Sequence, residues 1–171
     1  MIHLNLGSNL VSPHGSRFNN IIITINLLIE AKIEIKKISN FYETPSYPNK
    51  NFPKYLNVGL IVNYKNNYFD LFKKIKFIEK KLGRIKTKKN DPRVIDVDII
   101  DFKSEIKNTK ELILPHPKCH LRNFVLFPIL QIDPNWVHPI LKKNVQYLID
   151  NLSQKSRIEI TRLQKNVNVK T

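Results

Sequence analysis

Cysteine is nearly absent from this chain of 171 residues, in which Cys119 is the only one. A single thiol excludes an intrachain disulfide and a zinc site built on cysteines, and it fits a reducing compartment. No apolar run is long enough to cross a bilayer, and residues 1–5 lack the charged start and the apolar stretch of a signal peptide. Together these absences predict a cytoplasmic protein.

Acidic residues and glycine are scarce too. The chain has 14 Asp and Glu against 29 Lys and Arg, a formal net charge of +15 at pH 7. Such a balance suits nucleic acid, an anionic membrane surface or a phosphorylated ligand. Because lysine, isoleucine and asparagine are abundant while glycines number 4, we interpret the charge mainly as AT-rich coding bias combined with a phosphate site. Polyanion binding is the alternative. A P-loop pattern is missing, which excludes a Walker-type site.

The chain does contain a strand that carries two aspartates, at residues 92–99 (Pro-Arg-Val-Ile-Asp-Val-Asp-Ile). Strand side chains alternate between faces, so Asp96 and Asp98 share one face while the apolar residues line the other. Two neighbouring carboxylates repel each other, and a divalent cation relieves this best. Arg93 and the basic residues just before it add cations for phosphate. The segment predicts a site for Mg²⁺ and a polyphosphate; a solvated strand face is the alternative.

The pattern along residues 1–99 predicts the order β-α-β-β-α-β, the ferredoxin-like arrangement with an antiparallel sheet and both helices on one face. Ser16 is expected to cap the first helix, and Asn67 or Asp70 the second, which ends at Gly83. The predicted strands are residues 1–6, 33–42, 55–64 and 92–99, and the predicted helices are residues 16–30 and 67–82.

The rest of the chain is less regular. We expect a loop rich in proline and histidine after residue 103, a helix over Asn123–Leu130, and a less defined tail whose last part, residues 164–171, is loosely ordered. One α+β domain over 1–171 is predicted, with a motif-bearing core over 1–140 and an extension over 141–171 whose role stays open.

Two further groups of residues suggest ligand contacts. His116 and Arg122 can grip a phosphate tail, with His120 as a substitute, although a loop histidine beside a surface arginine is the plainer interpretation. A small heteroaromatic ligand needs a stacking ring with amide and hydroxyl partners. Such groups come from Thr44-Pro45, Tyr55, Asn57 and Phe124, where Asn57 as a turn residue and Phe124 as a core residue are the alternatives.

In order and spacing, these motifs resemble the 6-hydroxymethyl-7,8-dihydropterin pyrophosphokinases, enzymes of folate synthesis. The block over residues 92–99 is the most specific of them. The motifs run across residues 1–140 in family order: Leu6-Gly7-Ser8-Asn9-Leu10, Ser39-Asn40-Phe41-Tyr42-Glu43-Thr44-Pro45, Tyr55-Leu56-Asn57, Glu79 with Leu82-Gly83-Arg84, Leu114-Pro115-His116, and Arg122-Asn123-Phe124.

The resemblance implies a typically monomeric enzyme that moves the β,γ-diphosphate of ATP to the hydroxymethyl group of the pterin and leaves AMP. By resemblance, two Mg²⁺ ions bind Asp96 and Asp98, and Asp96 lies near the attacking hydroxyl. Arg84, Arg93 and the basic loop with Lys86 close over ATP. The remaining implied contacts are Glu79, Ile99, His116 and Arg122 for ATP, and Thr44, Pro45, Tyr55, Asn57 and Phe124 for the pterin.

Several positions depart from the usual pattern of that family. Lys86 keeps the charge of a loop arginine but loses its bidentate fork. The other departures are Asn90 and Asp91 in the basic loop, Ser46 and Pro48 in the predicted pterin loop, and Pro117 after His116. Two rival readings are an RNA-binding ferredoxin-like module without enzymatic activity and a decayed, inactive pyrophosphokinase. We predict an active enzyme with no nucleic acid or membrane partner.

Overall fold

The computed structural model describes residues 1–85 and 91–164. The predictions made for Lys86, for Asn90 and for the last residues, 165–171, lie outside this part of the chain. Within it, no helix has the length and apolar character needed to cross a membrane.

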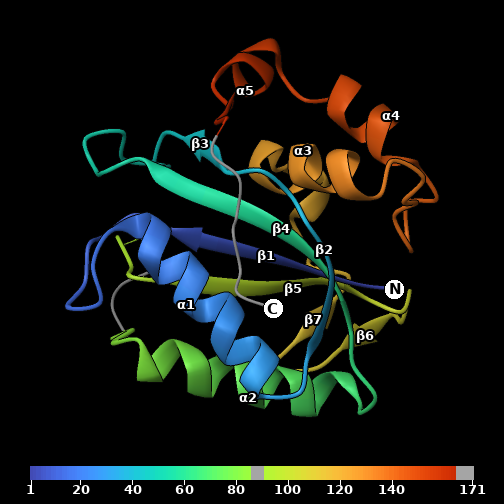
Figure 1. Cartoon of the computed structure of the whole chain (residues 1–171). Helices are drawn as coiled ribbons and strands as arrows, with labels where there is room; N and C mark the ends of the chain where they lie inside the picture. The colour runs from blue at the N-terminus through green and yellow to red at the C-terminus, as the bar shows by residue number, and fades with distance from the viewer. Residues whose placement is uncertain (86–90, 165–171) are drawn as a thin grey trace.

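The order of elements follows the predicted ferredoxin-like series and then continues (Figure 1). The first six major elements are β1 (Ile2–Ser8), α1 (Arg17–Glu30), β2 (Glu34–Ile38) with β3 (Tyr42–Thr44), β4 (Tyr55–Asn63), α2 (Tyr68–Lys81) and β5 (Asp96–Phe102). After them come β6 (Lys107–Asn108), β7 (Ile113–Leu114), the 3₁₀ turn η1 (Cys119–Leu121), α3 (Asn123–Ile132), α4 (Val145–Asp150), α5 (Gln154–Ile158) and β8 (Thr161–Arg162).

The main sheet has the strand order β5-β1-β4-β3-β8, with β2 also paired to β4. All of these pairings are antiparallel, and α1 and α2 cover the same face of the sheet (Figure 1). Alternation explains this: Leu6, Val58 and Val97 lie side by side across β1, β4 and β5 and point into one buried core with the two helices. Ser16 and Asn67 cap α1 and α2 as predicted.

The second predicted strand, residues 33–42, is interrupted. It forms β2 and β3, separated by a short segment that contains Ser39. The buried Ser39 donates its backbone N–H to the Gly59 carbonyl, and its Oγ accepts the Gly59 N–H, each at 2.9 Å. A side chain therefore replaces one rung of the backbone ladder, which lets the chain shift register without leaving a buried donor unpaired.

α3 packs on the other face of the sheet, over β4. A Cβ at Gly59 would lie 2.7 Å from Pro128 Cβ, so only glycine admits the helix this close. α3 ends at Ile132, two residues beyond its predicted end, and it shares a second hydrophobic cluster with α4. This layer lies over β4 and β3, on the side of the sheet away from α1 and α2 (Figure 1).

The prediction of a less defined tail was wrong for residues 145–162, which form α4, α5 and β8. These elements are too short to show a helical or strand period in the sequence. They are fixed by tertiary contacts: β8 pairs with β3, and Asn123 Nδ2 donates to the Ser156 carbonyl at 2.6 Å. Asn144 and Ser153 also cap the two helices.

Candidate active site

The two aspartates lie on the sheet face opposite α1 and α2, at the end that α3 leaves open. Asp96 stands opposite Gly7, and Gly7 stands opposite Asn57 on the next strand. Asp98 stands opposite Asn5. Because directly opposed residues of antiparallel strands point to the same face, these side chains form one surface that continues from β5 to β4. The predicted alternation of residues 95–99 is confirmed, since Val97 and Ile99 are buried in the core on the other side.

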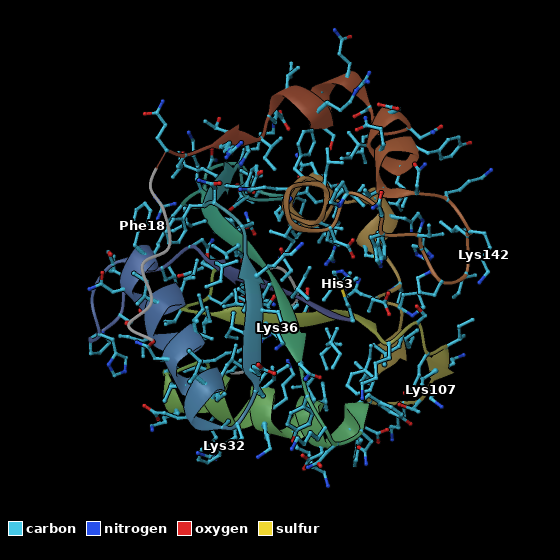
Figure 2. The ribbon with its side chains drawn as sticks, turned by 45° about the vertical axis from the view of Figure 1, so that its right-hand side comes forward. His3, Phe18, Lys32, Lys36, Lys107 and Lys142 are labelled. Atoms are coloured by element: carbon cyan, nitrogen blue, oxygen red, sulfur yellow. The ribbon has the colours of Figure 1, made fainter. Side chains whose placement is uncertain are left out.

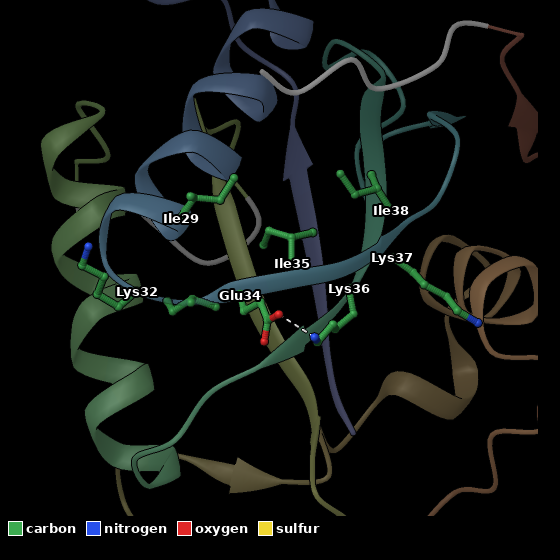
Figure 3. Close-up of a pocket in the computed structure, with 8 residues that line it drawn as sticks. Ile29, Lys32, Glu34, Ile35, Lys36, Lys37 and Ile38 are labelled. Atoms are coloured by element: carbon green, nitrogen blue, oxygen red, sulfur yellow. Dashed lines mark hydrogen bonds and ion pairs between the residues drawn. The ribbon is translucent and has the colours of Figure 1, made fainter. Parts of the chain in front are cut away.

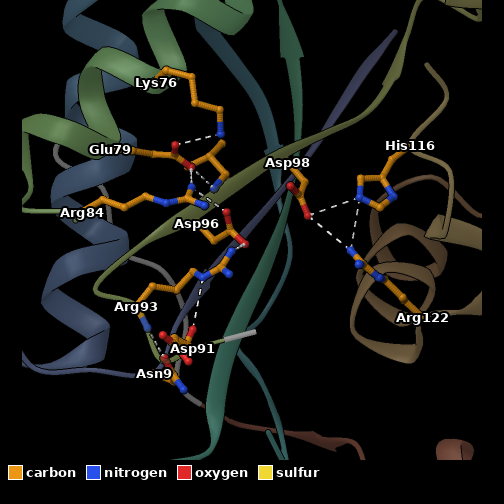
Figure 4. A network of polar contacts seen from close by, with 11 residues as sticks. Asn9, Lys76, Glu79, Arg84, Asp91, Arg93, Asp96, Asp98, His116 and Arg122 are labelled. Carbon is orange, nitrogen blue, oxygen red and sulfur yellow. Dashed lines mark hydrogen bonds and ion pairs between the residues drawn. The ribbon is translucent and has the colours of Figure 1, made fainter. Parts of the chain in front are cut away.

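Asp96 is held by two guanidinium groups (Figure 4). Its two carboxylate oxygens accept from Arg84 Nη1 at 2.7 Å and from Arg93 Nη1 at 2.8 Å. Burial raises the pKa of this carboxyl, but the charges of Arg84 and Arg93 together lower it by more, so the pKa lies below its ordinary value. Asp96 is thus a carboxylate at neutral pH, and its partners are the cations predicted to bind phosphate.

Glu79, on α2, holds the Asp96 side of the site in place. It is 1% exposed, and its carboxylate accepts from the Val97 N–H and from Lys76 Nζ, each at 2.8 Å, as well as from Arg84. With these three donors the side chain is fully engaged. It anchors α2 to β5 and orients Arg84 toward Asp96. Lys76 was not predicted as a site residue, although it lies three residues before Glu79 and so on the same helix face.

Asp98 has weaker partners. Its Oδ2 lies 3.4 Å from Arg122 Nη1 and 3.8 Å from His116 Nε2, and Arg122 Nη1 is also 3.3 Å from His116 Nε2 (Figure 4). Burial, followed by the charge of Asp96, raises the pKa of Asp98 to about 7. Burial and then the Arg122 charge lower the pKa of His116 to about 4, so its imidazole is neutral at pH 7. The structure brings together these two predicted phosphate contacts.

The donor set fits a divalent cation. Asp98 is about a quarter exposed and its pKa is raised to about 7, and among the described residues the nearest cationic group is Arg122 at 3.4 Å, so a metal ion between Asp98 and Asp96 would stabilise the ionised form. Asn5, opposite Asp98, adds a second sign: its Oδ1 is buried and has no hydrogen-bond donor among the described residues. An amide oxygen without a donor suits a metal ion or a water bound to it. Asn5 was not predicted, because nothing in the sequence of this apolar strand shows that it stands opposite Asp98.

Three of the residues predicted to bind an aromatic ligand meet where β3 pairs with β4: Tyr55 stands opposite Thr44, and Asn57 lies in the row that leads through Gly7 to Asp96. Asn57 is buried and donates through Nδ2 to Thr44 Oγ1 at 3.2 Å. A Cβ at Gly7 would lie 3.3 Å from Asn57 Oδ1 and 3.6 Å from the Tyr55 ring, so the glycine keeps this corner open. Phe124, at the start of α3, is half-buried and stacks with the Arg122 guanidinium at 5.4 Å. Pro45, half-buried, follows Thr44 at the end of β3.

Asn9 connects the two sides of this surface and was not predicted as a site residue, although it lies in the quoted Gly7-Ser8-Asn9 motif. Its Oδ1 accepts the Arg93 N–H at 2.7 Å, and its N–H donates to the Arg93 carbonyl at 3.2 Å. Its Nδ2 reaches the Pro53 carbonyl at 3.1 Å and Ser46 Oγ at 3.3 Å. Asn9 therefore braces Arg93 and the loop after Thr44 together. Ser46, one of the departures from the family pattern, serves here as a loop brace.

Two predicted residues lie elsewhere. The Ile99 side chain is 3% exposed and packs in the core with α1 and α2, so only its backbone can contact a ligand. His120 does not substitute for His116 or Arg122, because its imidazole Nδ1 is buried against Cys119 and His138, away from Asp98. This alternative depended on closeness in sequence, but successive side chains of a 3₁₀ turn point in different directions.

A pocket of about 560 Å³ lies at the opposite edge of the sheet, between the end of α1 and β2 (Figure 3). Isoleucine and lysine side chains line it, and the Lys36 ammonium is paired with Glu34 there at 2.5 Å. It contains no pair of acids and no histidine. Its residues are Ile29, Lys32, Ile33, Glu34, Ile35, Lys36, Lys37 and Ile38.

The chain is similar to known proteins over most of its length. Residues 3–134 match the family model described as 7,8-dihydro-6-hydroxymethylpterin-pyrophosphokinase. Over 142 residues the chain is 39% identical to a 2-amino-4-hydroxy-6-hydroxymethyldihydropteridine pyrophosphokinase of Aquifex aeolicus, covering 83% of this chain and 86% of that protein. The enzyme of the same name from Bacillus subtilis is 33% identical over 131 residues, covering 76% of each chain.

Longer proteins match over only part of their length. A folic acid synthesis protein of Dictyostelium discoideum is 38% identical over 141 residues, which are 82% of this chain and 21% of that one. The wild-type Plasmodium falciparum HPPK-DHPS crystal structure superposes with a TM-score of 0.67 at 17% identity, over 94% of this chain and 47% of that chain. At that identity the structure supports the fold alone. Both cases show that a domain of this kind also occurs as a part of larger chains.

Proposed function

The chain belongs to the 7,8-dihydro-6-hydroxymethylpterin-pyrophosphokinase family, and from that premise we propose which residues carry out the reaction. It is a pyrophosphokinase of folate biosynthesis. The enzyme transfers a diphosphate from ATP to the hydroxymethyl group of 6-hydroxymethyl-7,8-dihydropterin and releases AMP. The observation that carries the assignment of the active site is the pair Asp96 and Asp98 on one open strand face, ringed by Arg84, Arg93, His116 and Arg122.

We assign the magnesium site to Asp96 and Asp98, with two ions in the loaded enzyme. Bound Mg²⁺ would neutralise the triphosphate and orient it toward the acceptor. A metal ion held by Asp96 would compete with Arg84 and Arg93 for this carboxylate and would leave both guanidiniums available for phosphate oxygens. Glu79 keeps Arg84 in reach during this exchange, because it holds the same guanidinium from the other side.

On the other side of the site, Arg122 and the neutral His116 bind the phosphates of ATP. Arg122 points at Asp98, so it would meet a phosphate bound beside that carboxylate. A neutral imidazole can donate one hydrogen bond to a phosphate oxygen without adding charge. The Ile99 backbone faces the nucleotide, and Lys86, outside the described residues, stays a predicted contact.

The pterin ring occupies the corner formed by Thr44, Pro45, Tyr55, Asn57 and Phe124. Asn57 supplies a donor and an acceptor in the plane of the ring, and the Tyr55 and Phe124 rings supply stacking surfaces. Since Asn57 stands in the same row as Asp96, the hydroxymethyl group of a ring held there lies beside the metal-binding carboxylate. There Asp96 lies close to the attacking hydroxyl.

The test is an assay of AMP release from ATP. We expect AMP only when Mg²⁺ and 6-hydroxymethyl-7,8-dihydropterin are both present, and no AMP with either one omitted. In Asn57→Ala the pterin concentration needed for half-maximal rate should rise about tenfold, while the ATP requirement stays unchanged. AMP formed at the same rate without the pterin would refute the transfer reaction. An equal rise of both requirements would refute the assignment of Asn57.

We also propose that residues 1–171 form one monomeric cytoplasmic domain, in which the extension over 141–171 supports the pterin corner. The support for this is that β8 pairs with β3, the strand that carries Thr44. Size-exclusion chromatography with light scattering checks the monomer, which a dimer mass at micromolar concentration would contradict.

A further inference from the structure

A second group of metal-ligating side chains lies outside the active site, in the layer formed by η1, α3 and the turn after α3. Cys119 and His120 belong to η1, and His138 follows Trp136 in that turn. One ligand atom from each of the three side chains lies within 4.8 Å of the other two. Cys119 and His138 are buried, and His120 is half-buried. Their side chains are not among those proposed to bind ATP, magnesium or pterin, but the Cys119 backbone contacts two of those residues: its N–H donates to the His116 carbonyl at 3.0 Å, and its carbonyl accepts the Arg122 N–H at 3.3 Å.

His120 has an unmet hydrogen-bonding capacity inside this cluster. Its Nδ1 is buried and has no partner among the described residues. The His120 and His138 rings stand nearly perpendicular, with centroids 5.6 Å apart and an angle of 85°. A buried imidazole nitrogen without a partner costs free energy, and a metal ion bound to its lone pair removes that cost.

The local charge also favours a cation. Asp101, on β5, is 2% exposed and accepts from Trp136 Nε1 and from the Ser104 N–H, each at 2.8 Å. Both donors are neutral, and Asp101 forms no ion pair with a lysine or arginine in the part of the chain that the structure describes. Its charge adds to the burial that raises the pKa of the Cys119 thiol, and it opposes the burial that lowers the pKa of His138. A divalent ion bound to the cluster would balance this acid together with a Cys119 thiolate.

We propose that Cys119, His120 and His138 bind one zinc-class divalent ion, separate from the magnesium site. One thiolate with two imidazoles is a ligand set that suits Zn²⁺, whereas Mg²⁺ prefers oxygen ligands. Zinc needs its ligand atoms about 3.5 Å apart, so the cluster closes by about 1 Å on binding. Water completes the coordination on the accessible side of His120. The Cys119 proton leaves for solvent as the Zn–S bond forms.

His138 shows where binding must change the structure. Its Nδ1 accepts the N–H groups of Ile140 and Leu141, each at 3.2 Å. Binding metal through Nε2 places the ring proton on Nδ1, and both of these long contacts are lost. The turn over residues 138–142, which carries Lys142 in Figure 2, therefore rearranges when the ion binds. Since η1 connects His116 with Arg122, the ion also fixes the Asp98 side of the active site to this turn.

The test adds Co²⁺, and separately Zn²⁺, to the full chain with excess Mg²⁺ present. We expect one equivalent of Co²⁺ to give a thiolate-to-cobalt absorption band that Zn²⁺ removes and Mg²⁺ does not. In amide NMR, the Ile140 and Leu141 signals should shift on Zn²⁺ addition. The band should disappear in Cys119→Ser. In His120→Gln the Co²⁺ affinity should fall at least tenfold. Both the band and the affinity should stay unchanged in the control His14→Ala, whose imidazole is exposed.

Several results would overturn the site: no band in the wild type, a band that survives in Cys119→Ser, or displacement of Co²⁺ by Mg²⁺. Unshifted Ile140 and Leu141 signals would remove His138 from the ligand set and so contradict the proposal. If Cys119→Ser fails to fold, His120→Gln still tests the site. His120 is half-buried, so this variant is expected to fold, and its circular dichroism spectrum checks that it does. These outcomes are independent of AMP release, so the pyrophosphokinase assignment and the second metal site stand or fall separately.

Discussion

The sheet face that α1 and α2 leave free has two ends that treat acidic side chains in opposite ways. At the open end, Asp96 and Asp98 face arginines and are each about a quarter exposed. At the end covered by the C-terminal layer, Asp101 is buried and meets the neutral Trp136 indole, with His3 opposite it on β1 (Figure 2). Ion pairs that solvent can reach exchange partners easily, whereas buried neutral hydrogen bonds do not. The open end is built to take a ligand, and the covered end to hold the layers together.

A second contrast lies within the open end itself. Asp96 and Asp98 are two residues apart on one strand, yet the pKa of Asp96 is lowered and that of Asp98 is raised to about 7. Asp96 has two guanidiniums within 2.8 Å, whereas among the described residues Asp98 has one, that of Arg122 at 3.4 Å. At neutral pH the Asp98 carboxyl of the metal-free protein is therefore partly protonated, and a bound metal ion would favour its ionised form more than that of Asp96, which the guanidiniums already keep ionised.

The largest effect is expected for Asp98→Ala. Turnover should fall at least about 1,000-fold, equivalent to about 4 kcal/mol of lost transition-state stabilisation, because a metal ligand is removed. Stability at pH 8 should not fall, since the variant relieves the burial of a charge beside Asp96. Steady-state AMP release and thermal unfolding measure the two effects. Asp150→Ala, an exposed acid on α4, is the matched control. Retained turnover in Asp98→Ala would remove it from the metal site.

Arg93→Ala tests the partner of Asp96. We expect kcat to fall about 100-fold with little change in ATP affinity, because the contact between the freed Arg93 and the phosphates tightens as charge develops on them in the transition state. Single-turnover kinetics and equilibrium titration with a nonhydrolysable ATP analogue separate the two quantities. Arg157→Ala, an exposed arginine on α5, serves as the control. A loss confined to ATP affinity would mean that Arg93 acts in binding alone.

Asn5→Ala tests the unpaired oxygen opposite Asp98. Mn²⁺ affinity, followed by electron paramagnetic resonance, should weaken about tenfold, while thermal stability stays level because Oδ1 has no donor to lose in the metal-free protein. Asn63→Ala changes an exposed asparagine and should leave Mn²⁺ binding alone. Equal Mn²⁺ affinity in the wild type and in Asn5→Ala would mean that the amide oxygen faces no metal or metal-bound water.

The smallest effect is expected at the covered end. His3 bonds Asp133 at 2.9 Å, and burial lowers the pKa of His3 despite the charges of Asp133 and Asp101. The unfolded chain then binds a proton at His3 more readily than the folded one, so the wild type should lose stability as the pH falls below about 6.5. His3→Gln should cost about 1 kcal/mol at pH 8 and flatten this decline. Urea unfolding between pH 5 and pH 8 measures it. A parallel decline in both proteins would contradict the prediction.

Much of the fold could be predicted from the sequence because its signals are local. The period of α2, the caps Ser16 and Asn67 and the alternation over 95–99 each depend on near neighbours. The short elements α4, α5 and β8 could not be predicted, because long-range pairing decides them. For the site, the structure brings several of the predicted residues together, but Asn5, Asn9 and Lys76 were not predicted. Asn5 depends on a neighbour on another strand, which a single sequence does not mark, whereas Asn9 stood in a recognised motif and Lys76 shares the helix face of Glu79 by its spacing.

The sequence by itself determined that two carboxylates share one strand face and that arginines flank them, because alternation along a strand is fixed by the backbone. Only the tertiary structure decided which carboxylate has two close cations and which has one more distant cation among the described residues, because that depends on where the segments after α2, before β5 and before α3 place Arg84, Arg93 and Arg122. It also brought Cys119 and His120 against His138, since burial and proximity across a fold are properties of packing and not of sequence order.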